Sequence, residues 1–230
     1  MKGVPGDAAR RRGLKRILVP LLLLGIAFGA GLGLVAGALC PLPHWTGLAV
    51  LAAATLGMAL YGRRQQAFVY GFFKGARGEE MTAGELARLG GDWTVYNGLL
   101  LPDGTDIDHV AVGPQGLFVV ETKHWSGAVR VENGQILANG RPVTHRPPVA
   151  QVRRAVAALA KELSLPETAL HGVLCFAGKQ FPAPAALDEI CVCSHLGLAD
   201  ALAKGGETLA AADRARIVAR LDHLAITEGL

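Results

Sequence analysis

The 230-residue sequence lacks the short motifs that identify several large enzyme classes. It contains no H-E-x-x-H, no Walker A motif and no G-x-S-x-G. It therefore carries no sequence signal for a zinc protease, a P-loop nucleotide hydrolase or a serine hydrolase of the α/β type. The pair Gly75-x-x-Gly78 is too short to count as a phosphate-binding loop.

Cysteine is scarce, and its spacing excludes two further kinds of site. The four cysteines, Cys40, Cys175, Cys191 and Cys193, match neither a zinc ribbon nor a redox pair. Cys191 and Cys193 could be imagined as metal ligands together with His195, but "EICVCSH" is an apolar, strand-like run. Buried, reduced thiols are the better interpretation in a cytoplasmic domain.

Charge is absent from two long stretches near the N-terminus, Ile17–Leu39 and Pro41–Gly62. At about 1.5 Å per residue, each helix could cross a hydrocarbon layer of about 30 Å, the second only narrowly. The short break "CPLPH" separates them, so residues 17–62 are predicted to form a transmembrane helical hairpin. A cleaved signal peptide fits less well, because the first run is long and a second run follows it.

Basic residues flank the predicted hairpin on one side only. Six cations precede the first span, Arg63 and Arg64 follow the second, and the connecting loop has none. The positive-inside rule then predicts a multi-pass protein of the inner (cytoplasmic) membrane, with both termini and the soluble domain in the cytoplasm. Of the net charge of +4, residues 1–16 contribute +5 and Arg63 with Arg64 contribute +2, whereas the chain from Gln65 onward contributes −3. The basic character thus belongs to the anchor and suits anionic lipids; it is no evidence for nucleic-acid binding.

Small residues recur every four positions along both apolar stretches. Gly25, Gly29, Gly33 and Gly37 share one face of the first helix, and Ala49, Ala53 and Gly57 repeat the spacing in the second. Such faces let helix backbones approach closely in lipid. Packing of one span on the other is the expected use, and a homo-oligomer formed through the glycine-rich faces is the alternative.

After a linker at 63–74, residues 75–230 have the length of a single domain. A helix is expected to end near Gly90, and a strand follows within "DWTVYNGLLL". The remaining expected strands are 108–112, 117–123, 128–132, 136–138, "HGVLCFA" and "EICVCS", and the remaining helices are 148–163, 198–204 and 208–224. This order predicts an α/β domain with a mixed β-sheet flanked by helices.

Two acids and a lysine stand at the ends of the hairpin "IDHVAVGPQGLFVVETKHW". If Gly113–Gly116 form the loop, Asp108 lies opposite Glu121, with Cβ atoms about 5 Å apart, and Lys123 points the same way. A three-residue loop with a bulge would instead separate the carboxylates. Pro114 disfavours the primed two-residue turn, because its φ cannot be positive.

Adjacent carboxylates repel each other and raise each other's pKa, and a divalent cation relieves this repulsion. Oxygen ligands select hard ions, so Mg²⁺ or Mn²⁺ is the expected cofactor. Lys123 could then stabilise a hydroxide nucleophile or the charge that builds on a phosphate. Spacing alone fits an exposed salt bridge among Asp108, Glu121 and Lys123 equally well.

The segments "GARGEE" and "TDIDHVAVGPQGLFVVETKHWSG" with the following Pro-x-x-Gln resemble the NERD (nuclease-related) domain. This family is a branch of the PD-(D/E)XK nuclease superfamily, and the resemblance covers about residues 75–163. It implies a PD-(D/E)XK-like fold and a nuclease that uses a divalent metal. One departure is Pro147, since the family usually has Asn before the proline of this motif.

The resemblance also assigns roles to individual residues. Asp108 matches the metal-binding aspartate, and Glu121-Thr122-Lys123 matches the E-x-K motif. Glu79 matches the acidic residue of the first helix and a third metal ligand, and Gln151 matches the glutamine of the second helix. Helical spacing agrees that Glu79 and Gln151 lie on apolar faces, although helix-terminus placement explains both as well.

Other polar residues carry weaker signals. His109 and His124 alternate away from the acids and are expected to pack or hydrogen-bond on the opposite face, and Trp125 is expected to be structural. Arg141, Arg146, Arg153 and Arg154 could contact a phosphate backbone, or form a solvated helix face.

The sequence therefore predicts a membrane-anchored cytoplasmic nuclease with Mg²⁺ or Mn²⁺ as cofactor and DNA favoured over RNA as partner. Its catalytic residues would be Glu79, Asp108, Glu121, Lys123 and Gln151. The alternative is a non-catalytic membrane-tethered module that binds nucleic acid or protein on the same fold.

Overall fold

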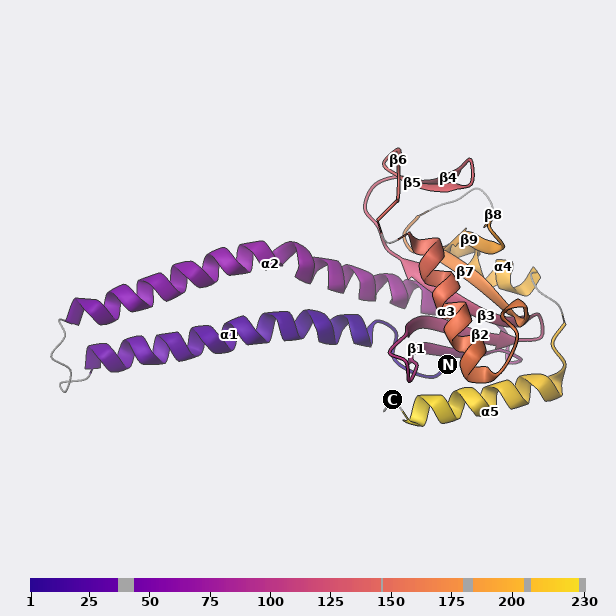
Figure 1. The fold of residues 1–230 in the computed structure, drawn as a ribbon, viewed down its shortest axis with the longest axis horizontal. Coiled ribbons are helices and arrows are strands. Elements are labelled where there is room, and N and C mark those ends of the chain that lie inside the picture. The colour runs from indigo at the N-terminus through magenta and orange to yellow at the C-terminus, as the bar shows by residue number, and fades with distance from the viewer. Residues whose placement is uncertain (37–43, 146, 180–183, 205–207, 228–230) are drawn as a thin grey trace. The chain divides into compact units, whose positions relative to one another are not determined.

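The computed structural model describes residues 1–36, 44–145, 147–179, 184–204 and 208–227. Internal contacts divide the chain into two compact units (Figure 1). One unit is Ala8–Lys74, and the other combines Met1–Asp7 with Gly75–Leu230. The first seven residues therefore belong to the same unit as the predicted nuclease domain.

The unit Ala8–Lys74 is built from two helices, α1 (Asp7–Ala36) and the N-terminal part of α2 (His44–Leu86). Among the described residues, one segment, Ala9–Gly31, is long and apolar enough to cross a membrane. This is evidence from length and composition alone, and the expected second span is not identified. The expected connection at 37–43, which includes Cys40, lies outside the described residues.

Residues 63–74, the expected linker, are helical. They are part of α2, which runs without a break into the "GARGEE" segment and ends at Leu86, before the predicted end near Gly90. The sequence contains no proline between His44 and Leu86, so no backbone N–H is missing and the helix has no cause to stop.

The glycine faces do not pack the two helices together. A Cβ atom built on Gly25, Gly29, Gly33 or Gly57 would meet no atom of the described residues within 4 Å. The close approach occurs instead at Gly13, where an added Cβ would lie 3.1 Å from Cβ of Phe72. The prediction of glycine-mediated packing within the hairpin is therefore wrong for these four positions, and Gly37 lies outside the described residues.

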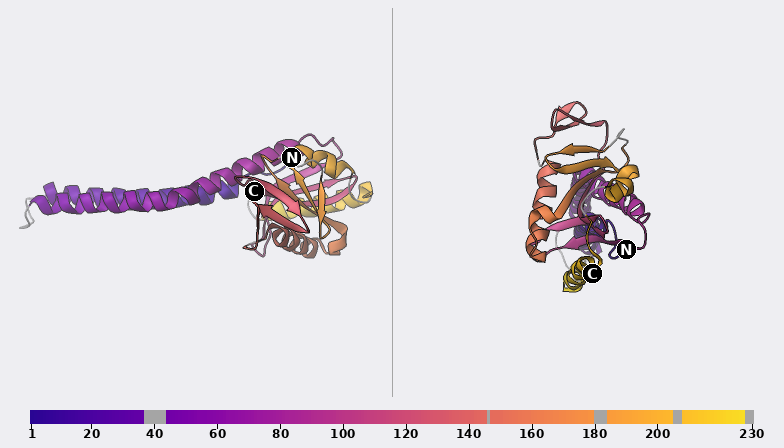
Figure 2. Two further views of the ribbon diagram at one scale, coloured as in Figure 1. Left: turned by 90° about the horizontal axis from the view of Figure 1, so that it is seen from above. Right: turned by 90° about the vertical axis from the view of Figure 1, so that its right-hand side faces the viewer.

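The second unit contains a six-stranded mixed sheet in the order β1-β2-β3-β7-β9-β8 (Figures 1 and 2). Its strands are β1 (Thr94–Leu100), β2 (Asp106–Gly113), β3 (Gly116–Lys123), β7 (Leu170–Phe176), β8 (Ala185–Leu187) and β9 (Ile190–Ser194). β1, β2 and β3 pair with one another in antiparallel fashion, β3, β7 and β9 run parallel, and β8 is antiparallel to β9. The predicted fold class, a mixed sheet flanked by helices, is confirmed.

Helices cover both faces of this sheet, as the two views of Figure 2 show. α3 (Pro148–Leu163) and α5 (Ala211–Thr227) pack on one face, and α4 (Leu198–Lys204) with residues 75–86 of α2 packs on the other. Glycines allow two close approaches: a Cβ on Gly172 of β7 would lie 2.8 Å from Val152 of α3, and one on Gly78 of α2 would lie 2.6 Å from His124 Cβ. These contacts set how closely α3 approaches β7 and how closely α2 approaches the end of β3, the strand that carries Glu121.

A second, three-stranded sheet is not paired with the first, but it contributes Ile136 to the same hydrophobic core. It consists of β4 (Val129–Glu132), β5 (Gln135–Ala138) and β6 (Arg141–Pro142). The hairpin between β4 and β5 turns at Asn133 and Gly134, both with positive φ, as the Asn-Gly pair predicts.

Candidate functional site

The pairing of β2 with β3 brings the two acids of the hairpin to opposing positions. Val112 pairs with Leu117 and His109 with Val120, so the same register continued by one residue sets Asp108 opposite Glu121. The predicted pairing of Val112 with Leu117 is therefore confirmed. The loop itself is shorter than expected: Gly113 pairs with Gly116, which leaves only Pro114 and Gln115, neither of them with positive φ. The turn is thus unprimed, as the fixed φ of proline requires.

Asp108 lies in an environment that disfavours its ionised form. Its side chain is partly buried, and Oδ2 accepts a hydrogen bond from the backbone N–H of Thr122 at 2.7 Å. Burial raises the pKa of Asp108 well above its usual value, and the nearby carboxylates of Glu121 and Glu79 raise this pKa further. The Thr122 N–H and the Lys123 ammonium offset only part of the effect. Three of the predicted ligands therefore share one electrostatic environment.

Lys123 forms an ion pair with Glu121: its Nζ donates to Oε1 of the carboxylate. The two side chains are only 20% and 13% exposed. The pair is thus shielded from water, unlike the exposed salt bridge that spacing alone allowed. In a shielded pair, removal of one partner leaves an uncompensated charge, so the two groups depend on each other.

Glu79 lies on α2, on the turn that follows Gly78. Its Oε2 accepts a hydrogen bond from the backbone N–H of Gly6 at 2.9 Å. The close contact of Gly78 with His124, the residue after β3, brings this part of α2 against the strand that carries Glu121 and Lys123. The position of Glu79 therefore depends on both a glycine contact and the N-terminal segment.

Gln151 and Glu121 line the same small depression, of about 240 Å³. The other lining residues are Thr105, Asp106, Arg154 and Ala155. Gln151 belongs to the first turns of α3, and the tight packing of α3 on Gly172 brings its N-terminal end close to β3. The structure therefore places Gln151 beside Glu121, whereas Glu79, Asp108 and Lys123 do not line this depression.

Asp106 and Arg154 are also at this depression, and sequence reasoning did not assign Asp106 any role. Asp106 stands two residues before Asp108 and therefore on the same face of β2. The alternation in "DIDH" was the available signal. Arg154, exposed on α3, brings a cation beside Glu121 and Gln151.

The acids of the hairpin offer oxygen ligands to a divalent cation. No group of three or more His, Cys, Asp or Glu side chains among the described residues is arranged to hold a metal ion. Burial and, after it, the Glu121 carboxylate nevertheless raise the pKa of Asp108, and the two acids supply only oxygen donors. Because Mg²⁺ keeps several waters and is commonly held by one or two carboxylates, this pair fits Mg²⁺ or Mn²⁺. One carboxylate oxygen of Glu79, Oε2, accepts a hydrogen bond from the Gly6 N–H, so Glu79 would have to bring its other oxygen to the cation as a third ligand.

The residues expected to be structural have structural contacts. His109 is fully buried on the face opposite Asp108, its Nδ1 is 2.8 Å from Asn97 Oδ1, and burial lowers its pKa to about 3. Trp125 packs edge-on against Phe176, with ring centroids 5.2 Å apart. Cys175 and Cys193 are buried free thiols, as predicted, whereas Cys191 is a free thiol that is only partly buried.

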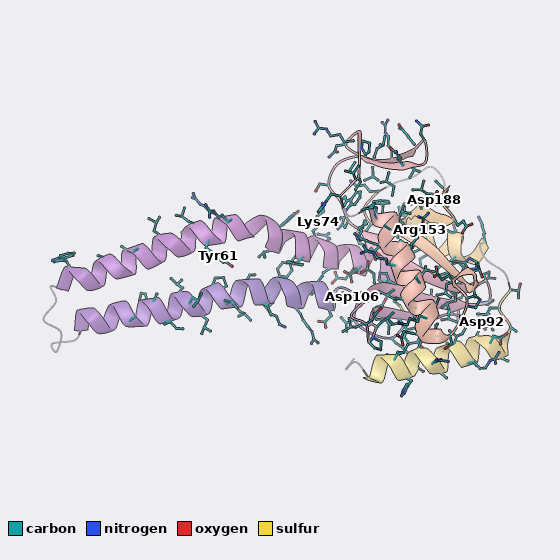
Figure 3. The ribbon with its side chains drawn as sticks, in the orientation of Figure 1. Tyr61, Lys74, Asp92, Asp106, Arg153 and Asp188 are labelled. Atoms are coloured by element: carbon teal, nitrogen blue, oxygen red, sulfur yellow. The ribbon has the colours of Figure 1, made fainter. Side chains whose placement is uncertain are left out.

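The four arginines have different surroundings. Arg153 pairs with Asp188 at 2.8 Å (Figure 3), so an intramolecular partner already holds it. Arg154 lines the depression beside Glu121, and Arg141 lies in the exposed small sheet. Arg146 lies outside the described residues. Of the three arginines that the structure describes, Arg154 is the one that lines the same depression as Glu121.

Comparison with known proteins gives one result. Residues 74–177 match a family model described as the nuclease-related domain, NERD. This range contains every candidate residue, from Glu79 to Gln151. No curated protein and no solved structure matches the chain.

Proposed function

Because residues 74–177 form a nuclease-related domain of the NERD family, we propose that this chain is a nuclease that hydrolyses phosphodiester bonds with Mg²⁺ or Mn²⁺. The observation that carries the proposal is the grouping of Asp108, Glu121 and Lys123. Two carboxylates that repel each other lie beside an ammonium group, on adjacent strands and partly shielded from water. Such a set favours a bound divalent cation and negative charge on a phosphate.

The roles proposed for the residues follow from their contacts. Asp108 and Glu121 hold the cation, and Glu79 assists as a third acid. A bound cation would lower the pKa of a water and neutralise charge on the phosphate. Lys123 donates a hydrogen bond to the attacking water or to a phosphate oxygen as negative charge builds. Gln151, beside Glu121 in the depression, orients that carboxylate or the water.

The setting of the activity is also part of the proposal. The apolar segment Ala9–Gly31 supports attachment to a membrane. We propose the multi-pass arrangement, with the catalytic domain on the cytoplasmic side, from the distribution of Lys and Arg around residues 17–62. Nucleic acid is the proposed partner, DNA before RNA. Self-association through the glycine faces remains part of this proposal, since Gly25, Gly29 and Gly33 are not used within the described helix pair.

A second function is favoured by one specific observation. The Lys123 ammonium already forms an ion pair with Glu121. The described residues also contain no preformed group of three metal ligands. A module that binds nucleic acid or protein at the membrane without cleaving it would need neither a free lysine nor a metal. A nuclease should bind divalent metal and cleave nucleic acid in its presence, whereas a binding module should need no metal and cleave nothing.

The test uses the full chain purified in detergent, because Met1–Asp7 belongs to the nuclease-related unit. Labelled single-stranded DNA, double-stranded DNA and RNA are incubated with the protein and EDTA, Mg²⁺ or Mn²⁺. We expect cleavage that EDTA abolishes and either metal restores, and that Asp108→Ala and Glu121→Ala both lose. Glu132→Ala, an acid in the exposed small sheet, is the matched control and should cleave normally. If the protein bound nucleic acid but showed no metal-dependent cleavage, the nuclease function would be wrong and the non-catalytic binding module would take its place.

A further inference from the structure

The first residues of the chain extend the main sheet at its β1 edge. Lys2 forms a parallel bridge with Tyr96 of β1. The backbone N–H of Lys2 donates to the Val95 carbonyl at 2.8 Å, and the N–H of Asn97 donates to the Lys2 carbonyl at 2.8 Å. The Asn97 side-chain amide donates to the same carbonyl at 3.2 Å. This short segment therefore pairs with an edge that would otherwise expose unpaired backbone groups.

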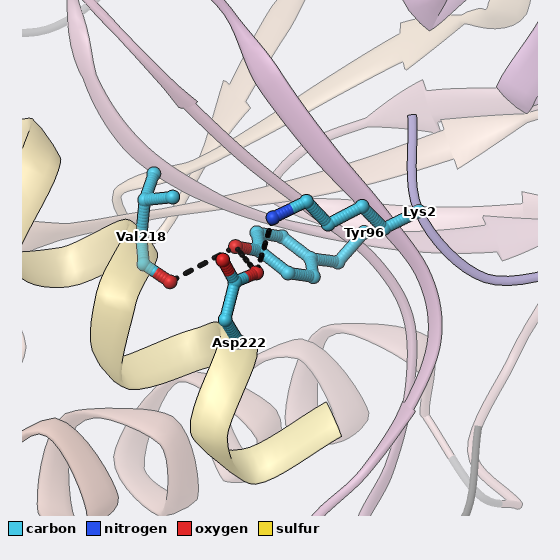
Figure 4. A network of polar contacts seen from close by, with 4 residues as sticks. All are labelled: Lys2, Tyr96, Val218 and Asp222. Atoms are coloured by element: carbon cyan, nitrogen blue, oxygen red, sulfur yellow. Dashed lines mark hydrogen bonds and ion pairs between the residues drawn. The ribbon is translucent and has the colours of Figure 1, made fainter. Parts of the chain in front are cut away.

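Side chains fasten the segment as well (Figure 4). Lys2 Nζ forms an ion pair with Asp222 of α5 and lies 5.3 Å from the centre of the Tyr96 ring. The Tyr96 hydroxyl donates to Asp222 Oδ1 at 2.6 Å and lies 3.0 Å from the Val218 carbonyl. The hydrogen bonds from Lys2 and Tyr96 hold the pKa of Asp222 below its usual value. The N-terminus, β1 and α5 thus form one polar network.

Two glycines allow the segment to lie this close. Gly3 has a φ of +76°, and a Cβ atom there would lie 2.2 Å from the Asn97 carbonyl oxygen. Gly6 has a φ of +75°, and a Cβ atom there would lie 2.7 Å from Cα of Ala76. Any other residue at either position would be strained and would also clash with backbone or Cβ atoms. The path of the segment is therefore specified by its sequence.

The segment ends at the candidate site. The N–H of Gly6 donates to Oε2 of Glu79 at 2.9 Å. Glu79 is also one of the two carboxylates that raise the pKa of Asp108. A backbone N–H has no rotamers and does not titrate, so it fixes one oxygen of the carboxylate in a defined place.

We propose that Met1–Asp7 is a positioning segment of the active site, in which the Gly6 N–H orients Glu79 toward the metal held by Asp108 and Glu121. The inference rests on the proposed function and deepens it: the site is assembled from two regions of the chain that α1 and most of α2 separate. Partners that hydrogen-bond a metal-ligating carboxylate typically contribute 10- to 100-fold in metal affinity.

The test measures Mn²⁺ affinity of the full chain in detergent by titration calorimetry. Gly6→Ala should weaken Mn²⁺ binding about 10- to 100-fold. Val4→Ala is the control, because Val4 is 57% exposed and keeps the backbone pairing. In a Glu79→Ala background, Gly6→Ala should produce no further loss, since the group that it orients is gone. This non-additivity separates positioning from general distortion.

A second variant protects the test from a folding failure of Gly6→Ala. Deletion of residues 2–6 removes the segment without a clash, and it should weaken Mn²⁺ binding similarly. It should also increase hydrogen exchange at the Asn97 amide, which donates to Lys2. Unchanged Mn²⁺ affinity in both variants, or an equal loss with and without the Glu79 carboxylate, would overturn the proposal.

The outcomes also separate this inference from the nuclease itself. A wild-type chain that binds Mn²⁺ without cleaving any nucleic acid contradicts the proposed function, whereas a loss of Mn²⁺ affinity in Gly6→Ala still supports the positioning role. A wild-type chain that cleaves, with both variants binding Mn²⁺ normally, contradicts only the positioning role. A wild-type chain that binds no Mn²⁺ contradicts both.

Discussion

Asp108 accepts a hydrogen bond from the backbone N–H of Thr122, the central residue of Glu121-Thr122-Lys123. This 2.7 Å contact ties the end of β2 to the end of β3, where the ladder of backbone pairs has already stopped at His109 and Val120. One acid thus uses an oxygen to fix the strand that carries the second acid and the lysine.

Replacing Asp108 with Asn should stabilise the metal-free protein and remove its response to metal. The amide keeps an acceptor for the Thr122 N–H but removes a charge that burial, Glu121 and Glu79 all disfavour. Thermal unfolding at pH 7.5 should show a higher Tm than wild type in EDTA. Addition of Mn²⁺ should raise the Tm of wild type and leave that of Asp108→Asn unchanged. A Mn²⁺-induced rise of equal size in both proteins would exclude Asp108 as a ligand.

Replacing Lys123 with Ala should separate metal binding from cleavage. Both carboxylates remain, and Glu121 loses a competitor for its oxygen, so Mn²⁺ affinity should be kept or increased. Cleavage should fall by at least about 100-fold, as expected when a charge-stabilising donor is lost. The measurement is Mn²⁺ titration together with cleavage rate on one substrate.

Lys161→Ala is the matched control for this change, since Lys161 is an exposed lysine on α3. It should alter neither quantity. If Lys123→Ala lowered stability and left the cleavage rate intact, Lys123 would be only the partner of a shielded ion pair.

The register of the acidic hairpin could be predicted because two local signals agree. Buried and partly buried residues alternate at the charged ends of both strands, at 106–109 and 120–123, although the rest of each strand is buried, and Pro114 cannot adopt the positive φ of a primed turn. The helix Pro148–Leu163 was predicted at its observed bounds for the same kind of reason: prolines stand where they are tolerated at its start. Local patterns thus located Asp108, Glu121, Lys123 and Gln151.

The N-terminal segment could not be predicted in this way. Its pairing partner Tyr96 is more than ninety positions away, and a single bridge leaves no alternating pattern in the sequence. In the sequence, Lys2 is only one of the cations that precede the predicted span. The glycines at 3 and 6 gain a role only through Asn97 and Ala76, which lie beside them in the folded chain. Long-range contacts of this kind depend on the complete fold.

Acidification should destabilise the nuclease-related unit through His109. Burial lowers the pKa of His109 to about 3, below the value of about 6.5 in an unfolded chain. Between these two values the unfolded state binds more protons than the native state. The stability contribution is therefore fully present above about pH 6.5 and falls with decreasing pH, by at most about 1.4 kcal/mol per unit.

The measurement is chemical denaturation between pH 7.5 and pH 5, compared with His109→Gln, which cannot be protonated in this range. The free energy of unfolding should fall more steeply with decreasing pH in wild type than in this variant. His145→Gln, at an exposed histidine, should follow the wild-type slope. Equal slopes for wild type and His109→Gln would mean that His109 does not keep its buried, neutral state.

Adding a methyl group at Gly78 should damage the site from a distance. The new Cβ would lie 2.6 Å from His124 Cβ and 3.4 Å from Ala177 Cβ, so α2 must move away from β3 and β7. Overpacking of this kind typically costs about 1 to 3 kcal/mol. Because Glu79 follows directly, the shift should also weaken Mn²⁺ binding.

Gly84→Ala is the matched change in the same helix: its added Cβ meets no described atom within 4 Å, and the helix should gain about 0.5 to 1 kcal/mol. The denaturation midpoint should therefore fall in Gly78→Ala and rise in Gly84→Ala. Mn²⁺ titration should show weaker binding in Gly78→Ala than in Gly84→Ala. A Gly78→Ala protein as stable as Gly84→Ala, with wild-type Mn²⁺ affinity, would show that the close contact of α2 with β3 does not position Glu79.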